Sequence, residues 1–298
     1  MSTKMVAKTL WRELLLLLAL DLLPTDQARA QETAGPDSTQ LVRVILRDGS
    51  ELIGRILTTG EQQIELKALA GFTVAIPRAE IERVEKLRGE LREGRFLQPD
   101  PNNTRLFFAP TGRSLPQGEG YFAVYWLFFP TIAIGITNWL ALSGGYSLLP
   151  GAEEQIAFFA PKVRLLHLPS FDLSSGFLYL HIPWGDGDSG GGILYGVGSV
   201  GNADRSWTAG LGWGFSGGKL ADKPVLMFGG ELRTGRRTKL LSENYLFWEE
   251  ETTSLLSLGI RFFGAHLAAD FGLFTSGELI SREEGFPFFP WVDFAYSF

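Results

Sequence analysis

The stretch YFAVYWLFFPTIAIGI, residues 121–136, decides the fold class of this chain. Its odd positions include the small residues Ala123, Thr131, Ala133 and Gly135, and its even positions are all apolar: Phe122, Val124, Trp126, Phe128, Pro130, Ile132, Ile134 and Ile136. Strict alternation predicts a β-strand, because successive side chains of a strand point to opposite faces. We therefore expect a strand over residues 120–136 with one large apolar face and one small face.

The alternation recurs towards the C-terminus, most clearly in residues 207–216, which read WTAGLGWGFS. Large side chains occupy the odd positions, and small residues occupy the even positions. A soluble sheet would carry charges on one face, whereas here the second face is mostly Gly, Ala, Ser and Thr. This pattern predicts an all-β chain built on an antiparallel transmembrane β-barrel, with large apolar residues towards lipid and small residues towards the lumen.

Residues 104–298 provide enough chain for about 12 strands of 9–11 residues and their turns. Barrels of this kind in bacteria have an even number of strands, so ten or fourteen strands are the alternatives. The expected strands are 104–111, 120–136, 139–149, 155–167, 173–183, 190–201, 205–217, 223–235, 238–249, 252–264, 265–275 and 286–298.

The chain ends on alternating aromatic residues that share one parity: Phe288, Phe294, Tyr296 and the terminal Phe298. This ending resembles the closing strand of bacterial outer-membrane proteins. The resemblance implies that Phe294, Tyr296 and Phe298 form an assembly signal for the barrel-assembly machinery. It also implies contact with outer-membrane lipids.

The first thirty residues have the organisation of a signal peptide. Lys4, Lys8 and Arg12 precede the apolar run of residues 14–20, and Ala28-Arg29-Ala30 provides a small-residue cleavage pattern. We expect cleavage near Ala30, although a short buried helix is the alternative. No other window approaches the roughly 20 apolar residues of a membrane-spanning helix.

A polar linker, residues 31–40, precedes a small β-domain over residues 41–87, and residues 88–103 form a second linker. Within the domain, the alternating residues 42–46 and the turn Asp48-Gly49 predict a hairpin. The pattern RDGSELIGRIL…IELKALAGFTVAIPRAEIERVE, within residues 47–85, resembles small SH3-like or Sm-like accessory domains of bacterial envelope proteins. That resemblance implies a periplasmic spacer or contact module.

The composition limits the other classes of function. A net charge of −6 and a pI near 5.3 argue against a nucleic-acid partner, which requires a basic surface. The chain has no cysteine, which excludes disulfides and thiolate metal sites. Asp186 and Asp188 are too few for a calcium site, so neither a metal nor a cofactor is predicted.

Two hydrolase hypotheses arise from short motifs. Residues 187–191, GDSGG, match the nucleophile stretch of chymotrypsin-like proteases, but His167 and His181 lie too close in sequence to complete that family's triad. The stretch is better interpreted as a turn. A lipid hydrolase embedded in the membrane remains an alternative, with His181 or His266 as base and Ser189 or Ser257 as nucleophile.

A set of charged residues shares the parity of the small face and is expected to point into the lumen: Lys162, Arg164, Glu231, Arg233, Arg261, Asp270 and Asp293. One interpretation is that they pair and fill a closed barrel. The other is that they line a narrow selective pore or a ligand cavity.

The stretch NTRLFFAPTGRSLPQGEGYFAVYWLFFPTIAIGITNWLALSGGYSLLPG, residues 103–151, resembles a group of bacterial outer-membrane proteins with no assigned activity, in which a small β-domain precedes a barrel. The resemblance implies location in the outer membrane. The leading hypothesis is a structural or passively permeating barrel, not an enzyme. A lipid hydrolase and a soluble envelope β-protein are the alternatives.

Overall fold

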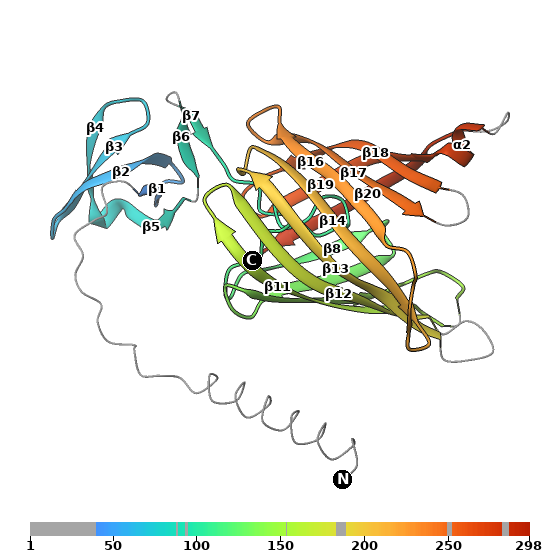
Figure 1. Cartoon of the computed structure of the whole chain (residues 1–298). Helices are drawn as coiled ribbons and strands as arrows, with labels where there is room; N and C mark the ends of the chain where they lie inside the picture. Colours follow the sequence, from blue (N-terminus) through green and yellow to red (C-terminus); the bar gives the residue numbers. More distant parts are fainter. Residues whose placement is uncertain are drawn as a thin grey trace, which may run out of the picture. The chain divides into compact units, whose positions relative to one another are not determined.

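The computed structural model describes residues 40–87, 89–92, 95–152, 154–182, 189–248, 252–281 and 286–298 (Figure 1). The predicted signal peptide, linker residues 31–39, Asp186 and Asp188 lie outside these residues. The chain divides into two compact units after Leu87, and each unit is described by itself.

The first unit is a five-stranded antiparallel sheet whose strands lie in the order β4-β3-β2-β1-β5. Its core consists of Val42, Val44, Ile64, Leu66 and Ile76. The elements are β1 (Leu41–Leu46), β2 (Glu51–Thr59), β3 (Gln63–Ala68), β4 (Thr73–Pro77), the 3-10 helix η1 (Arg78–Glu80) and β5 (Ile81–Lys86).

The turn between β1 and β2 lies at the predicted position. Gly49 adopts a φ of 85°, a conformation that favours glycine. The backbone N–H of Ser50 donates to Oδ1 of Asp48 at 2.8 Å, and this hydrogen bond lowers the pKa of the Asp48 carboxyl. The local sequence therefore specifies this turn.

The second unit begins with a hairpin of β6 (Glu90–Arg92) and β7 (Arg95–Leu97), followed by residues 98–119, which contain no named strand. The remaining strands are β8 (Gly120–Tyr125), β9 (Phe129–Gly135), β10 (Leu140–Tyr146), β11 (Ala157–Leu168), β12 (Phe171–Ile182), β13 (Ser189–Gly201), β14 (Arg205–Ser216), β15 (Lys219–Leu220), β16 (Val225–Arg233), β17 (Thr238–Trp248), β18 (Thr252–Phe263), β19 (Leu267–Ser276) and β20 (Phe289–Ser297), with helix α2 (Gly277–Ser281) before β20.

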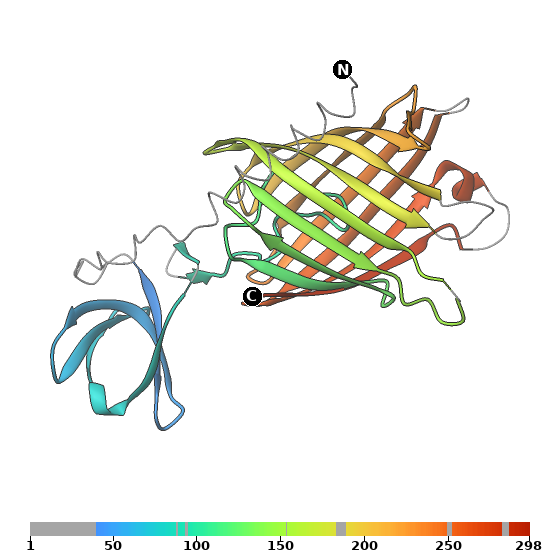
Figure 2. The same ribbon diagram turned by 90° about the horizontal axis from the view of Figure 1, so that it is seen from below.

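These strands close into the predicted antiparallel barrel of twelve strands (Figure 2). Each strand pairs with its neighbours in the sequence, and β20 closes the ring by pairing with β8. The two-residue β15 only extends β14 and is not part of the ring. The predicted all-β fold class is confirmed.

The strand total agrees with the prediction, but two individual strands were predicted wrongly. Residues 104–111 do not form a barrel strand, and a single bridge, Arg105 to Pro110, is their only strand-like pairing. Residues 120–136 form two strands, β8 and β9, rather than one. The turn between them lies at Trp126 and Leu127, with φ values of 47° and 64°. Bulky residues rarely adopt this conformation, so nothing in the apolar run indicated a turn at this position.

The predicted alternation is confirmed around the barrel. Outward residues such as Leu211 and Leu258 are 42% and 63% exposed, whereas inward Ser199 and Thr208 are 3% exposed. The outer surface therefore consists mainly of aliphatic and aromatic side chains. Separately, the described residues include no helix that is long and apolar enough to cross a membrane.

The two ends of the barrel differ in their connections. At one end, here called the terminal rim, the turns are short (136–139, 169–170, 202–204, 234–237 and 264–266), and the barrel begins and ends there. The backbones of Gly120 and Phe298 exchange two hydrogen bonds of 3.0 and 2.9 Å at this rim. The opposite end, the loop rim, carries longer connections such as 147–156 and 277–288.

Candidate functional site

Residues 98–118, here called the plug segment, enter the lumen of the barrel before the first barrel strand begins. Figure 2 shows this segment as a teal trace inside the ring of strands. It folds back on itself, because Leu106 N–H donates to Ala109 O and Thr111 N–H donates to Thr104 O, both at 2.9 Å. Leu106, Phe107 and Thr111 are completely buried. The plug segment is therefore part of the lumen interior.

Arg105 anchors the plug segment to two barrel strands. Its guanidinium bonds Asp293 on β20 at 2.7 Å and Asp270 on β19 at 3.1 Å, and it lies over the ring of Tyr125, 5.2 Å from the ring centroid. Burial alone would lower the pKa of Arg105, but Asp293, Tyr125 and Asp270 raise it well above its usual value. Arg105 thus carries a permanent charge inside the lumen.

Asp100 supplies the opposite charge from the plug segment. One oxygen of its carboxylate lies 3.0 Å from both Lys239 on β17 and Arg261 on β18. Burial raises the pKa of this carboxyl, but the attraction of Arg261 and Lys239 outweighs burial and holds it well below the usual range. Arg261 also bonds Asp270 at 2.7 Å, which joins the two anchors into one network.

Glu231 on β16 extends the network to a third anchor. Arg113 of the plug segment donates to Oε1 of Glu231 at 2.5 Å, and Lys239 donates to Oε2 at 2.7 Å. Ser206 on β14 donates to Oε1 at 3.0 Å. Buried carboxylates need such complete pairing, because an unpaired buried charge is strongly destabilising.

Hydrogen bonds to backbone groups of the plug segment complete the attachment. The carboxylate of Glu243 on β17 accepts the backbone N–H groups of Phe108 and Ala109, both at 2.9 Å. The hydroxyl of Ser199 accepts the N–H of Gly112 at 2.9 Å, and Ser174 donates to the carbonyl of Gly112 at 2.6 Å. Strands on all sides of the lumen therefore hold the plug segment.

The structure brings together most of the charged residues that the sequence indicated. Arg261, Asp270 and Asp293 meet around Arg105, and Glu231 joins them through Lys239. Five of the seven are buried, while two are half-buried. The five are Lys162, Glu231, Arg261, Asp270 and Asp293, and the two are Arg164 and Arg233.

The three residues outside the central cluster have separate surroundings. Arg233 bonds Asp204 and donates to the carbonyl of Gln98 at 2.9 Å. Lys162 donates to backbone carbonyls of the plug segment. Arg164, among the side-chain hydrogen bonds of the described residues, makes none with this network.

The sequence did not indicate five residues of the network: Asp100, Arg105, Arg113, Lys239 and Glu243. Three belong to the plug segment, part of which was predicted as a linker and part as a barrel strand. The other two lie on β17, where Leu240 and Leu241 are adjacent and the parity of the strand is ambiguous. Lys239 and Glu243 do share one parity, and two charges on one face of the expected strand were the signal that could have indicated them.

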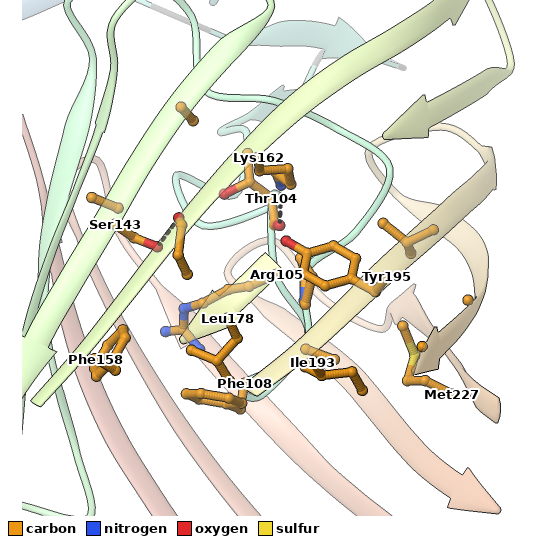
Figure 3. Close-up of a pocket in the computed structure, with 18 of the residues that line it drawn as sticks. Thr104, Arg105, Phe108, Ser143, Phe158, Lys162, Leu178, Ile193, Tyr195 and Met227 are labelled. Carbon is orange, nitrogen blue, oxygen red and sulfur yellow. Dashed lines mark hydrogen bonds between the residues drawn. The ribbon is translucent and has the colours of Figure 1, made fainter. Parts of the chain in front are cut away.

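A cavity of about 250 Å³ lies beside the plug segment, on the side of the loop rim (Figure 3). Most of its lining is aromatic or aliphatic: Phe108, Phe158, Leu178, Ile193, Met227 and Tyr245. Thr104, Arg105 and Lys162 also line it. In the described residues, no group of three potential metal ligands is present.

The geometry does not support Ser257 and His266 as a lipid-hydrolase pair. The hydroxyl of Ser257 donates to the carbonyl of Glu243 at 2.5 Å, and His266 Nδ1 lies 2.9 Å from the carbonyl of Ser297 at the terminal rim. Ser257 lies six residues before Phe263, the end of β18, which places it roughly 20 Å from that rim. The side chain of Ser189 is outside the described residues, although residues 189–191 belong to β13 rather than to the expected turn.

No family model matches the chain, and no curated protein matches it. Among solved structures, the chain is similar to a KdgM porin in complex with disordered oligogalacturonate, at 11% identity and a TM-score of 0.45, covering 60% of this chain and 98% of that one. It is also similar to OmpT, an outer-membrane protein of Vibrio cholerae, at 11% identity and a TM-score of 0.34, covering 87% and 95%. Values this low do not assign the chain to a family.

Proposed function

We propose that this chain is an outer-membrane β-barrel whose lumen is closed by its own plug segment, so that small solutes permeate passively only when that segment is displaced. The observation that carries the proposal is Arg105, a buried plug residue bonded to Asp270 and Asp293 of the barrel wall. A segment held by buried ion pairs cannot leave the lumen without exposing or stranding charge.

The outer surface supports the membrane location. Large apolar side chains such as Phe122, Ile132 and Leu273 are 43–55% exposed on the outward face. A soluble envelope protein with so continuous an apolar exterior would associate or aggregate. The closed ring also leaves no unpaired strand edge, which is the condition for crossing a bilayer with strands.

The connections support one orientation. Short turns face the periplasm and longer loops face outwards in bacterial barrels. On this rule the terminal rim is periplasmic, and so is the start of the barrel at Gly120. The small domain, residues 41–87, is then a periplasmic contact module on the same side.

Conductance measurements test the closed barrel directly. In planar bilayers we expect wild-type protein to give no steady channels, whereas Arg105→Gln combined with Arg113→Gln should give ion conductance. Arg205→Gln combined with Arg237→Gln, at exposed positions of the terminal rim, is the matched control and should remain closed. Steady wild-type conductance equal to that of the plug variant would refute the proposal.

We infer that Phe294, Tyr296 and Phe298 serve assembly rather than packing. Their side chains are 42–52% exposed on the outward face, so their removal costs little packing. Phe298→Ala keeps the backbone pairing with Gly120, yet it should reduce outer-membrane accumulation. Normal accumulation of this variant would contradict the role. Cleavage of the signal peptide near Ala30 belongs to the same export route.

The small domain is proposed to be SH3-like or Sm-like. The order β4-β3-β2-β1-β5, with short antiparallel neighbours, supports this class. Phe72 and Leu57 are 52% and 42% exposed, which suits a contact module. A tag inserted at Gly60 should be inaccessible from outside intact cells and accessible after the outer membrane is permeabilised. Labelling of intact cells would contradict the periplasmic placement.

A further inference from the structure

The cavity beside the plug segment is larger than packing defects usually are. Its volume of about 250 Å³ exceeds the roughly 150 Å³ that holds one benzene molecule in an engineered protein. An unfilled apolar cavity destabilises a fold, because its lining atoms lose their contacts. A cavity of this size can hold a small apolar molecule.

The walls of the cavity suit a small apolar body. Phe158 on β11, Leu178 on β12 and Ile193 on β13 contribute side chains from three neighbouring strands. Phe108 of the plug segment also lines the cavity, with its ring centroid 6.5 Å from that of Phe158, and it remains 37% exposed. An aromatic ring left open inside a lumen provides a surface for stacking or apolar contact.

The other side of the cavity holds a lysine whose ammonium is hydrogen-bonded to backbone carbonyls rather than to a carboxylate. Lys162 is 8% exposed, and its ammonium donates to the carbonyls of Arg113 at 2.6 Å and of Thr104 and Thr111 at 3.3 Å. Among the described residues, no carboxylate forms an ion pair with it. Asp172, on the adjacent strand, is bonded to His167 at 2.6 Å instead.

A second buried lysine, Lys239, has the carboxylate partners that Lys162 lacks among the described residues. Lys239 lies in the same lumen and pairs with two carboxylates, Asp100 at 3.0 Å and Glu231 at 2.7 Å. Buried ammonium groups normally have such partners, because carbonyl dipoles alone compensate the charge incompletely. Figure 3 places Lys162 and Thr104 together, with Phe108, Phe158 and Ile193 on the opposite side.

We propose that this cavity binds a small monoanionic amphiphile, with its carboxylate at Lys162 and an apolar body of about phenylbutyl size among Phe158, Leu178 and Ile193. The volume of about 250 Å³ matches a free small molecule better than a lipid with two acyl chains. This goes beyond the proposed function, because binding depends on the cavity and not on displacement of the plug segment.

Isothermal titration calorimetry on the full chain in amphipol tests the proposal with two matched probes, 4-phenylbutyrate and 4-phenylbutylamine. Wild-type protein should bind the acid at least about tenfold more tightly than the amine. Ile193→Trp fills the cavity and should abolish binding of both probes. Lys162→Met should remove the preference for the acid, whereas Lys162→Arg should retain it. Lys219→Met, at an exposed position, is the control for loss of a positive charge.

Three outcomes would overturn the proposal: no binding of the acid to wild-type protein, equal binding of acid and amine, or unchanged binding to Ile193→Trp. Heat-modifiable gel mobility verifies that each variant is folded. If Lys162→Met does not fold, Lys162→Arg and Ile193→Trp still decide the question, because one preserves the charge and the other removes only the space.

Discussion

The two halves of the barrel lumen differ in chemistry. The half towards the terminal rim contains a buried ionic network that includes Arg261, Asp270 and Asp293. The half towards the loop rim contains apolar side chains such as Phe158 and Leu178, together with the cavity. A water-filled channel has a polar interior, whereas the lumen half towards the loop rim is mostly apolar.

The residues of the plug segment follow the same division into an ionic half and an apolar half. Arg105 belongs to the ionic half, and two residues later Phe107 enters the apolar half. The ring of Phe107 lies 5.5 Å from that of Phe274 and 6.1 Å from that of Trp291. The comparison shows that inward charges can hold a segment of the chain instead of lining a pore.

The largest expected effect comes from breaking the ionic half. Arg105→Ala leaves Asp293 buried without its cation, since the other side-chain partner of Asp293 is the indole N–H of Trp291 at 2.6 Å. Loss of one member of a buried pair costs about 3–5 kcal/mol. Unfolding in urea, followed by tryptophan fluorescence in lipid vesicles, measures the loss.

A double variant separates the ion pair from simple loss of packing. In the Arg105→Ala background, Asp293→Asn should recover part of the stability, because it removes the stranded charge. A loss below about 1 kcal/mol for Arg105→Ala, or no recovery in the double variant, would show that the ionic half does not hold the plug segment.

The outer surface provides the next effect, because it differs from both halves of the lumen. Leu211→Arg places a charge towards lipid and should cost about 2–4 kcal/mol. Gly214→Ser, three residues along β14, adds a Cβ that meets only Ala221 at 3.8 Å and Gly192 at 3.9 Å, so it should fold normally. Equal behaviour of the two variants in heat-modifiable folding would contradict the membrane-barrel assignment.

The smallest effect compares one hydroxyl in each half. Ser174→Ala removes the 2.6 Å hydrogen bond to Gly112 of the plug segment, and Ser143→Ala removes a 3.0 Å bond within the wall, to Ala160. Each change should cost about 1 kcal/mol. In proteolysis of folded protein, only Ser174→Ala should increase cleavage within the plug segment. Equal cleavage of both variants would contradict the conclusion that Ser174 holds the plug segment and Ser143 does not.

The barrel could be predicted from the sequence because alternation is a local property. Leu211 and Gly212 differ in exposure in the way their parity requires. The closing strand was predicted for the same reason, since Phe294 and Tyr296 share the outward parity. A period of two along the chain is enough to assign both faces of a strand.

The plug segment could not be predicted because its fold depends on contacts across more than a hundred residues. The apolar run Leu106-Phe107-Phe108 is compatible with a strand, and only the partners of Arg105, at positions 270 and 293, show that the segment lies inside. Pro110, which cannot donate to a ladder, was the one local sign against a wall strand. The missed turn at Trp126 and Leu127 had no glycine or asparagine to mark it.

Cysteine labelling measures the position of the plug segment most directly, because the chain has no native cysteine. Thr111 is completely buried between the plug segment and the wall, whereas Lys219 is exposed. In folded protein, Thr111→Cys should resist a water-soluble maleimide while Lys219→Cys reacts fully, and heat-unfolding should make the two react alike. If Thr111→Cys reacts in the folded barrel as fast as Lys219→Cys, the plug segment does not close the lumen.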